Sequence, residues 1–255
     1  MCLGSASADT REMTSRAATA SSRGTTLGIT NTRLNAARRG IAVELATRLA
    51  ATTGAPVCLV GADPADHDVQ RRLPQLLAGE AASRGFELTR GPRSLAVTNL
   101  AAHHLCVVSA TDRVALDAAL PELREIFGTV VIDAPSGVGG GVGIARDLLR
   151  SLDMLLVASG LRADELIETR RYLERLGEAP SIDEVDVGVI LSGDASDSQL
   201  ARDQLALRIA SLPVVGCVPR LWGRAAQART EELLEELDGA FAPVIEWISK
   251  RCANR

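Results

Sequence analysis

Short apolar runs that alternate with amphipathic helical segments constrain the fold of this chain more than any other feature. In the run at residues 57–60 (VCLV) every side chain is apolar, which is typical of a strand buried on both faces of a parallel sheet. Helices are predicted at residues 40–51, 112–127, 163–176 and 198–210. Strands are predicted at residues 26–30, 57–60, 105–108, 129–132, 155–158, 187–191 and 214–218.

This order of elements predicts an α/β fold with three layers. Strands that alternate with helices form a mostly parallel, doubly wound sheet, with right-handed crossovers that place helices on both faces. In such sheets the functional site lies beyond the carboxyl ends of the strands. Residues 31–40, Asp133 and Pro219 directly follow predicted strands, and Asp63 follows the strand at residues 57–60 after two residues. We therefore expect these residues on one rim of the sheet.

The composition is that of one ordinary globular domain. The chain has 255 residues, of which 46% are apolar and 24% charged. Residues 1–25 are rich in Ser, Ala, Thr and Arg and contain no continuous apolar stretch, so they predict a disordered leader that is neither a signal peptide nor a membrane span. We expect a single α/β domain at residues 26–255 and a cytoplasmic location.

Charge and cysteine content argue against two kinds of site. The formal net charge of -4 gives no strong nucleic-acid signal, because phosphate binding shows itself as a basic face or a strongly basic domain. The five cysteines include no Cys-x-x-Cys pair and no nearby histidine cluster. We expect no metal site of the cysteine and histidine type.

Four segments resemble a known family when they are taken together, in this order and at this spacing. They are residues 27–30 (LGIT), 59–64 (LVGADP), 130–137 (VVIDAPSG) and 212–219 (LPVVGCVP). They resemble the MinD/ParA group, P-loop ATPases with a deviant Walker motif that place the septum or partition chromosomes and plasmids. The resemblance runs from about residue 27 to residue 237 and implies a P-loop NTPase-like fold, although a fold does not by itself imply an activity.

The resemblance lays the phosphate-binding loop of the family, Lys-Gly-Gly-x-Gly-Lys-Thr-Thr, on residues 33–40. Leu34, Asn35 and Ala37 stand at the three glycine positions. Glycines are needed there because the loop wraps the phosphates with backbone N–H groups at distances that a Cβ obstructs. The resemblance therefore implies a degenerate phosphate-binding loop.

Positive charge survives in this loop although the glycines do not. Arg38 stands at the phosphate-binding lysine and Arg33 at the signature lysine that reaches across the family's dimer. Arg39 stands at the threonine whose hydroxyl holds Mg²⁺, and Gly40 at the next threonine. A guanidinium does not replace that ammonium, and the charge of Arg39 opposes a metal ion. These arginines are either solvated residues at a helix start or, with Asn35, a vestigial anion site at a helix N-terminus.

Polar residues at strand ends match other parts of the family's nucleotide site. Asp63 matches the second acid of the Asp-x-Asp strand end, which positions the attacking water, whereas Gly61 replaces the first acid. Asp133 matches the Walker B acid, although a strand-end Asp can also cap the following turn. Ser192 stands at the asparagine that frames adenine, and Pro219 is kept. Asp63 is the catalytic candidate if the chain is active, and Asp133 is the metal ligand if Mg²⁺ binds.

Two functions follow from these matches. We favour a pseudo-ATPase without a cofactor, a docking or positioning factor in cell division, partitioning, or envelope or secretion machinery. The alternative is an atypical ATPase that uses ATP and Mg²⁺ to control a dimer. Lys250 is the only lysine of the chain and lies near its C-terminus, so the alternative needs Arg38 to act as the phosphate lysine. A nucleotide-independent DNA-binding module is a third possibility, which requires a basic face.

The resemblance also implies a homodimer and a protein partner. Residues 241–255 carry apolar side chains at helical spacing and a basic end, as does the membrane-targeting tail of the family. Pro243 and Glu246 interrupt the apolar face, and residues 231–238 are acidic. We expect a last helix that packs on the sheet and does not bind membranes.

Overall fold

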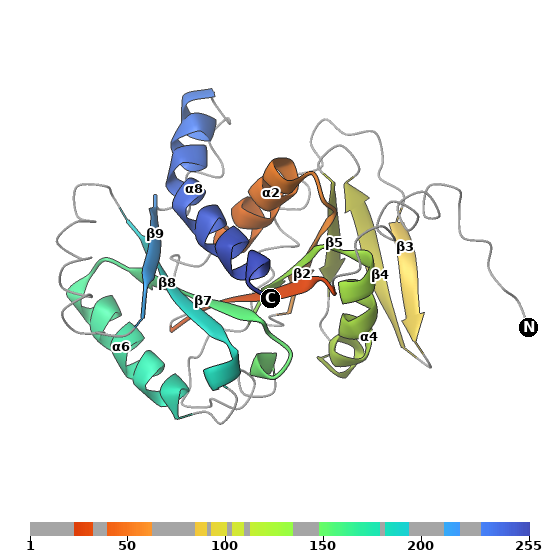
Figure 1. The fold of residues 1–255 in the computed structure, drawn as a ribbon, viewed down its shortest axis with the longest axis horizontal. Coiled ribbons are helices and arrows are strands. Elements are labelled where there is room, and N and C mark those ends of the chain that lie inside the picture. Colours follow the sequence, from red (N-terminus) through yellow and green to blue (C-terminus); the bar gives the residue numbers. More distant parts are fainter. Residues whose placement is uncertain are drawn as a thin grey trace, which may run out of the picture.

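The computed structural model has a central sheet with helices on both faces (Figure 1). The structure describes residues 23–32, 40–62, 85–90, 93–100, 104–109, 113–134, 148–178, 182–193, 212–219 and 231–255. Its strands are β1 (Thr25–Asn31), β2 (Val57–Gly61), β3 (Gly85–Arg90), β4 (Arg93–Leu100), β5 (Leu105–Ser109), β6 (Thr129–Asp133), β7 (Met154–Gly160), β8 (Asp186–Ser192) and β9 (Val214–Val218). Its α-helices are α2 (Ile41–Thr53), α4 (Arg113–Ile126), α6 (Ala163–Gly177) and α8 (Glu231–Ala253), with a short 3-10 turn, η2 (Ile182–Glu184).

The strands lie in the order β3-β4-β5-β2-β6-β1-β7-β8-β9. From β5 to β9 neighbouring strands are parallel, whereas β4 is antiparallel to both β3 and β5. This confirms the predicted doubly wound, mostly parallel sheet. The parallel strands are rich in Val, Ile and Leu because both of their faces are covered.

Two apolar cores lie on the two faces of the sheet, as a three-layer fold requires. One core lies beneath α4 and α6 and includes Leu123 and Tyr172. The other lies beneath α2 and α8 and includes Leu45 and Phe241. Alternate residues of the parallel strands serve the two cores, because successive side chains of a strand point to opposite faces.

The antiparallel pair β3 and β4 is the main element that the sequence analysis did not predict. Its six register pairs run from Gly85↔Thr98 to Arg90↔Arg93, and Thr98 also pairs with Val107 of β5. The sequence carries a signal for this hairpin, since apolar and polar residues alternate around Gly91 and Pro92. The predicted helix at 198–210 and the leader up to residue 22 lie outside the described residues. The first strand, β1, begins at Thr25, one residue before its expected start.

The helices α2 and α8 lie side by side on one face of the sheet (Figure 1). Gly54 ends α2 in the left-handed conformation that favours glycine, with φ 62°, and donates its N–H to the carbonyl of Ala50. The last helix begins at Glu231, ten residues before the apolar stretch from which a tail helix was expected. It packs on the sheet and on α2, so even the polar residues Glu44 and Arg48 of α2 are buried. Among the described residues, none of the helices is both long and apolar enough to cross a membrane.

Candidate functional site

Three polar side chains lie buried at the carboxyl edge of the sheet. Asn31 ends β1, Asp133 ends β6 and Ser192 ends β8, and they are 2%, 4% and 1% exposed. Ile29 pairs with Asp133 in the register of β1 and β6, and Ile29 faces the core beneath α2 and α8. Because strand side chains alternate between faces, all three polar residues lie on the face that α2 and α8 cover.

Hydrogen bonds hold the ends of these strands together. The backbone N–H of Ala134 donates to the carbonyl of Ile29 over 2.9 Å, and that of Ala62 donates to the carbonyl of Asp133 over 3.1 Å. Gly193 donates to the carbonyl of Val218 over 3.0 Å. The chain therefore brings Asp133 next to the end of β1, and Ser192 next to the buried Pro219 that follows β9.

Asn31 and Ser192 each bury a polar atom that is not satisfied. Neither Oδ1 of Asn31 nor Oγ of Ser192 has a hydrogen-bond partner within the part of the chain that the structure describes. A buried polar atom without a partner costs about 1–3 kcal/mol, so a hydrogen bond from a ligand or from a neighbouring segment would stabilise both atoms. The sequence analysis placed residue 31 on the rim without a role, although a polar residue that ends an apolar strand just before a loop is the signal that could have found it.

The start of α2 has a backbone conformation that depends on glycine. Gly40 precedes the helix with φ 85°, in the left-handed region, and its carbonyl accepts a hydrogen bond from the N–H of Glu44 over 2.9 Å. This residue stands where the resemblance places a threonine, and a β-branched residue is disfavoured at that φ. The other predicted loop residues and the strand-end acid lie outside the described residues; they are Arg33, Asn35, Arg38, Arg39 and Asp63.

Solved structures with the same arrangement include nucleotide-binding proteins. No protein-family model and no curated protein sequence matches this chain. MinD in the MinC:MinD cell division protein complex of Aquifex aeolicus superimposes with a TM-score of 0.62 at 15% identity, over 89% of this chain and 96% of that one. The chain has the MinD fold.

Two further structures with this fold contain a bound nucleotide. The septum site-determining protein MinD of Pyrococcus horikoshii, complexed with Mg-ADP, matches with a TM-score of 0.58 at 16% identity, over 89% of this chain and 96% of that one. Cobyrinic acid a,c-diamide synthase of Mycobacterium smegmatis, with a bound ATP analogue and magnesium, matches with a TM-score of 0.60 at 17% identity, over 88% and 95%. At these identities the likeness shows the fold, and activity has to be argued from the site.

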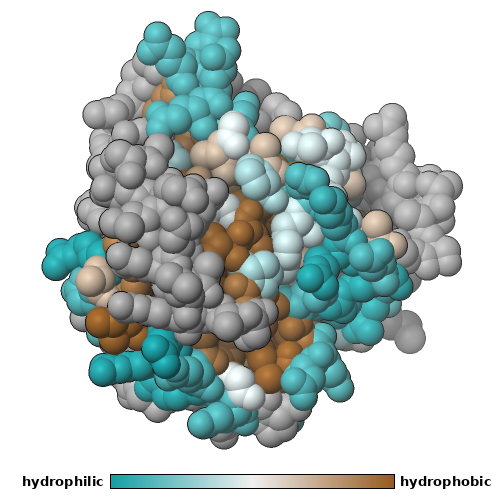
Figure 2. Space-filling model, turned by 60° about the vertical axis from the view of Figure 1, so that its left-hand side comes forward, coloured by the Kyte–Doolittle hydropathy of each residue, from teal (hydrophilic) through white to brown (hydrophobic). Residues whose placement is uncertain are grey.

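In this MinD-fold chain the residues of α8 nearest the carboxyl edge are acidic. Trp247 approaches Gly188 near the start of β8, whereas Val244 and Ala240 approach Gly216 farther along β9. Earlier residues of α8 therefore lie nearer the carboxyl ends of the strands. The first two turns of α8 appear as a hydrophilic projection in Figure 2, and they carry five carboxylates: Glu231, Glu232, Glu235, Glu236 and Asp238.

A cluster of buried hydroxyls lies on the opposite face, beneath α6. Oγ1 of Thr169 lies 2.8 Å from Oγ of Ser159, which donates to the carbonyl of Gly160 over 3.0 Å. Burial raises the pKa of Tyr172, which lies on the same face. The cluster ties α6 to the end of β7. The sequence analysis did not predict it, because hydroxyl residues in amphipathic segments carry no distinctive spacing.

Proposed function

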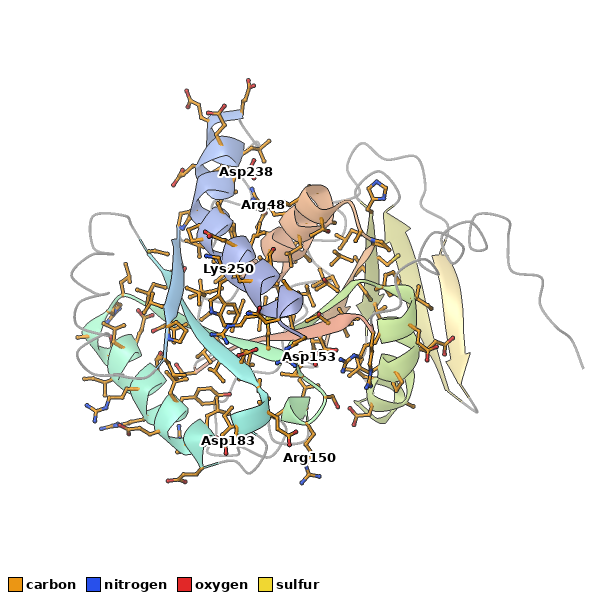
Figure 3. All side chains as sticks on the ribbon, viewed as in Figure 1. Arg48, Arg150, Asp153, Asp183, Asp238 and Lys250 are labelled. Carbon is orange, nitrogen blue, oxygen red and sulfur yellow. The ribbon has the colours of Figure 1, made fainter. Side chains whose placement is uncertain are left out.

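We propose that this chain is a MinD/ParA-like protein that does not hydrolyse ATP and acts as a docking or positioning factor for a protein partner in the cytoplasm. The observation that carries the proposal is the position of Lys250 in the fold (Figure 3). A phosphate-binding lysine is a central part of catalysis in this class of ATPase, and no other lysine exists in the chain.

Lys250 lies at the wrong edge of the sheet for phosphate binding. Its Nζ is 2.7 Å from Oε1 of Glu246, and the next residue, Arg251, pairs with Asp186, the first residue of β8. The carboxyl edge lies at the other end of β8, roughly 20 Å away at about 3.3 Å per residue. This lysine therefore cannot reach a phosphate at the carboxyl edge of its own chain.

The acidic start of α8 also opposes a nucleotide. Five carboxylates on the carboxyl-edge half of α8, of which Asp238 pairs with Arg48, add negative charge on the side of the sheet where a nucleotide's phosphates would lie. Phosphoryl transfer depends on positioning and on stabilisation of negative charge. If the missing lysine and the missing magnesium hydroxyl each cost about 3 kcal/mol, the rate falls by roughly four orders of magnitude.

ATP turnover by the purified full chain tests the proposal. We expect turnover at background, unchanged by Asp63→Ala, and no Mg²⁺-dependent binding of a labelled ATP analogue. The variants Arg38→Ala and Asp63→Ala should also leave stability and partner binding intact, because both positions are expected on an open rim. Mg²⁺-dependent turnover that Asp63→Ala abolishes would overturn the proposal in favour of the ATPase.

A second candidate, the nucleotide-controlled ATPase, is favoured by the polar atoms of Asn31 and Ser192 that no described residue satisfies. Grafting the family loop tests how much of a nucleotide site remains. Replacing residues 34–39 with Gly-Gly-x-Gly-Lys-Thr should produce Mg-ATP binding without turnover, because Gly61 still replaces an acid. Adding Gly40→Thr to the graft should cost about 1–3 kcal/mol of stability, since φ at residue 40 is 85°.

The homodimer is part of the same proposal and has a separate test. Light scattering during gel filtration should give twice the mass of the chain, which is 26.8 kDa, both with and without Mg-ATP. A monomer that becomes a dimer only with Mg-ATP would instead support the nucleotide-controlled alternative.

A further inference from the structure

The last turn of α8 and the two residues that follow it are fastened to the amino edge of the sheet by two arginines. Nη1 of Arg251 lies 2.8 Å from Oδ1 of Asp186, and Nη2 of Arg255 lies 3.0 Å from Oδ2 of the same carboxylate. Arg255 also donates to Oδ1 of Asp153 over 3.2 Å and to the carbonyl of Asp153 over 2.6 Å. Asp153 and Asp186 stand at the starts of neighbouring strands, so one arginine spans both.

Burial holds the rest of α8, but it does not hold this end. Leu237, Phe241, Val244 and Ile248 are buried in the core that α8 shares with α2. Beyond Ile248 only Cys252 is even half-buried, and its Sγ donates to Oγ1 of Thr25 over 3.4 Å. The last seven residues, 249–255, are therefore held to the rest of the domain mainly by polar contacts, and Cys252 alone of them packs against the core.

These ion pairs are of the kind that forms and breaks readily. The side chain of Arg251 is 44% exposed and that of Arg255 is 36% exposed. Part-exposed ion pairs contribute little and are screened by salt. Segments with few buried apolar contacts open locally while the rest of a domain stays folded.

The body of the protein is arranged to stay intact when this end detaches. Oδ2 of Asp153 accepts the backbone N–H of Thr26 over 2.7 Å and lies 2.8 Å from Nη2 of Arg124. Arg124 also donates to the carbonyl of Gly24 over 2.9 Å. Asp153 keeps these contacts without Arg255, whereas the ion pairs that Asp186 makes with Arg251 and Arg255 both belong to the C-terminal segment.

We propose that residues 249–255 form an ionic latch, which opens and closes at the amino edge of the sheet while the domain stays folded. Asp186 is its positioning residue, because it accepts both arginines. Opening uncovers Cys252 and the start of β1, and it is promoted by ionic strength. The inference is independent of whether the chain binds a nucleotide.

The cysteines of the chain supply the reporters. Cys252 lies in the latch, whereas Cys58 and Cys106 are buried in the core beneath α4. Burial raises the pKa of the Cys106 thiol to about 12 and that of Cys58 well above its usual value, so both thiols stay unreactive until the domain unfolds. Labelling of the full chain with iodoacetamide, followed by peptide mass spectrometry, measures latch opening at Cys252 and global unfolding at Cys58.

The variants Asp186→Asn and Arg255→Ala should each raise the labelling rate of Cys252 by about fivefold at low salt. Raising NaCl from about 0.05 M to about 1 M shortens the screening length to about 3 Å. This should raise the labelling rate of Cys252 in the parent by a similar factor, and by a smaller factor in Asp186→Asn. The rate at Cys58 should stay unchanged throughout. Arg170→Ala, which breaks the exposed pair of Arg170 with Glu174 on α6, is the matched control and should change neither rate.

Two outcomes would overturn the latch. If the labelling rates of Cys252 and Cys58 rise together, the end of α8 opens only with the whole domain. If the rate at Cys252 responds neither to Asp186→Asn nor to salt, the ion pairs do not hold the segment. The labelling rates of Cys252 and Cys58 are measured in the same digest. A variant that fails to fold is therefore recognised by rapid labelling of Cys58.

Discussion

The buried guanidinium of Arg48 gives the sharpest prediction about stability. Arg48 lies in α2 with its side chain 8% exposed, and its Nη1 is 2.5 Å from Oε2 of Glu44, which is 6% exposed. Its Nε is 2.8 Å from Oδ1 of Asp238 in α8, and its Cζ lies 5.4 Å from the ring centre of Phe241 (Figure 3). One side chain therefore joins two helices that cover the same face of the sheet.

Arg48→Met keeps the aliphatic volume and removes the charge. Removing one partner of a buried ion pair costs about 3–5 kcal/mol, because the other charge stays in a medium of low polarity. Here that charge is the carboxylate of Glu44, so we expect a loss of about 3 kcal/mol. At about 2–4 °C per kcal/mol for a domain of this size, the melting temperature should fall by about 6–12 °C.

Replacing both partners should recover much of the loss. Glu44→Gln with Arg48→Met removes both charges of this pair, so we expect at least half of the lost free energy of unfolding to return. Asp238→Asn is the matched control, since that side chain is 69% exposed and its ion pair should contribute less than about 1 kcal/mol. The assay is urea unfolding followed by circular dichroism. A loss below about 1 kcal/mol for Arg48→Met, or a double variant no more stable than the single one, would refute the reasoning.

Three further predictions concern pH, helix capping and membranes. Burial raises the pKa of the Cys106 thiol from 9.0 to about 12. Between these two pH values the unfolded chain releases a proton that the folded chain keeps, so stability falls as pH rises. The urea midpoint should therefore fall between pH 8 and pH 10, and it should fall less in Cys106→Ala. A Cβ at Gly160 would lie 2.0 Å from Oε2 of Glu165, and this oxygen accepts the N–H of Arg162 at the start of α6. Gly160→Ala should therefore lower the free energy of unfolding by about 1 kcal/mol, measured by thermal unfolding. In the background of Glu165→Ala, which has already removed the cap, Gly160→Ala should not lower it further. Finally, the full chain should not sediment with anionic liposomes, and sedimentation that depends on residues after Ala240 would contradict this.

Some of this protein could be derived from its sequence because the governing interactions are local or periodic. Runs such as residues 57–60 are apolar at every position, which is typical of a strand covered on both faces. The end of each run then located Asp133 and Ser192 at one edge of the sheet, and the structure buries both there. The composition of the loop at residues 33–40 is likewise a property of the sequence alone, and its consequence for nucleotide binding stays a prediction.

Other features were decided only by the tertiary structure. The predicted amphipathic helix at residues 40–51 gives no sign that the polar residues Glu44 and Arg48 are buried, because α8, far along the chain, covers them. The same holds at the amino edge, where Arg255 reaches Asp153 across 102 residues. Periodicity reports which face of a segment is apolar, but not what packs against its other side. The charges that hold α8 in place therefore became visible only when strand order and register had brought distant residues together.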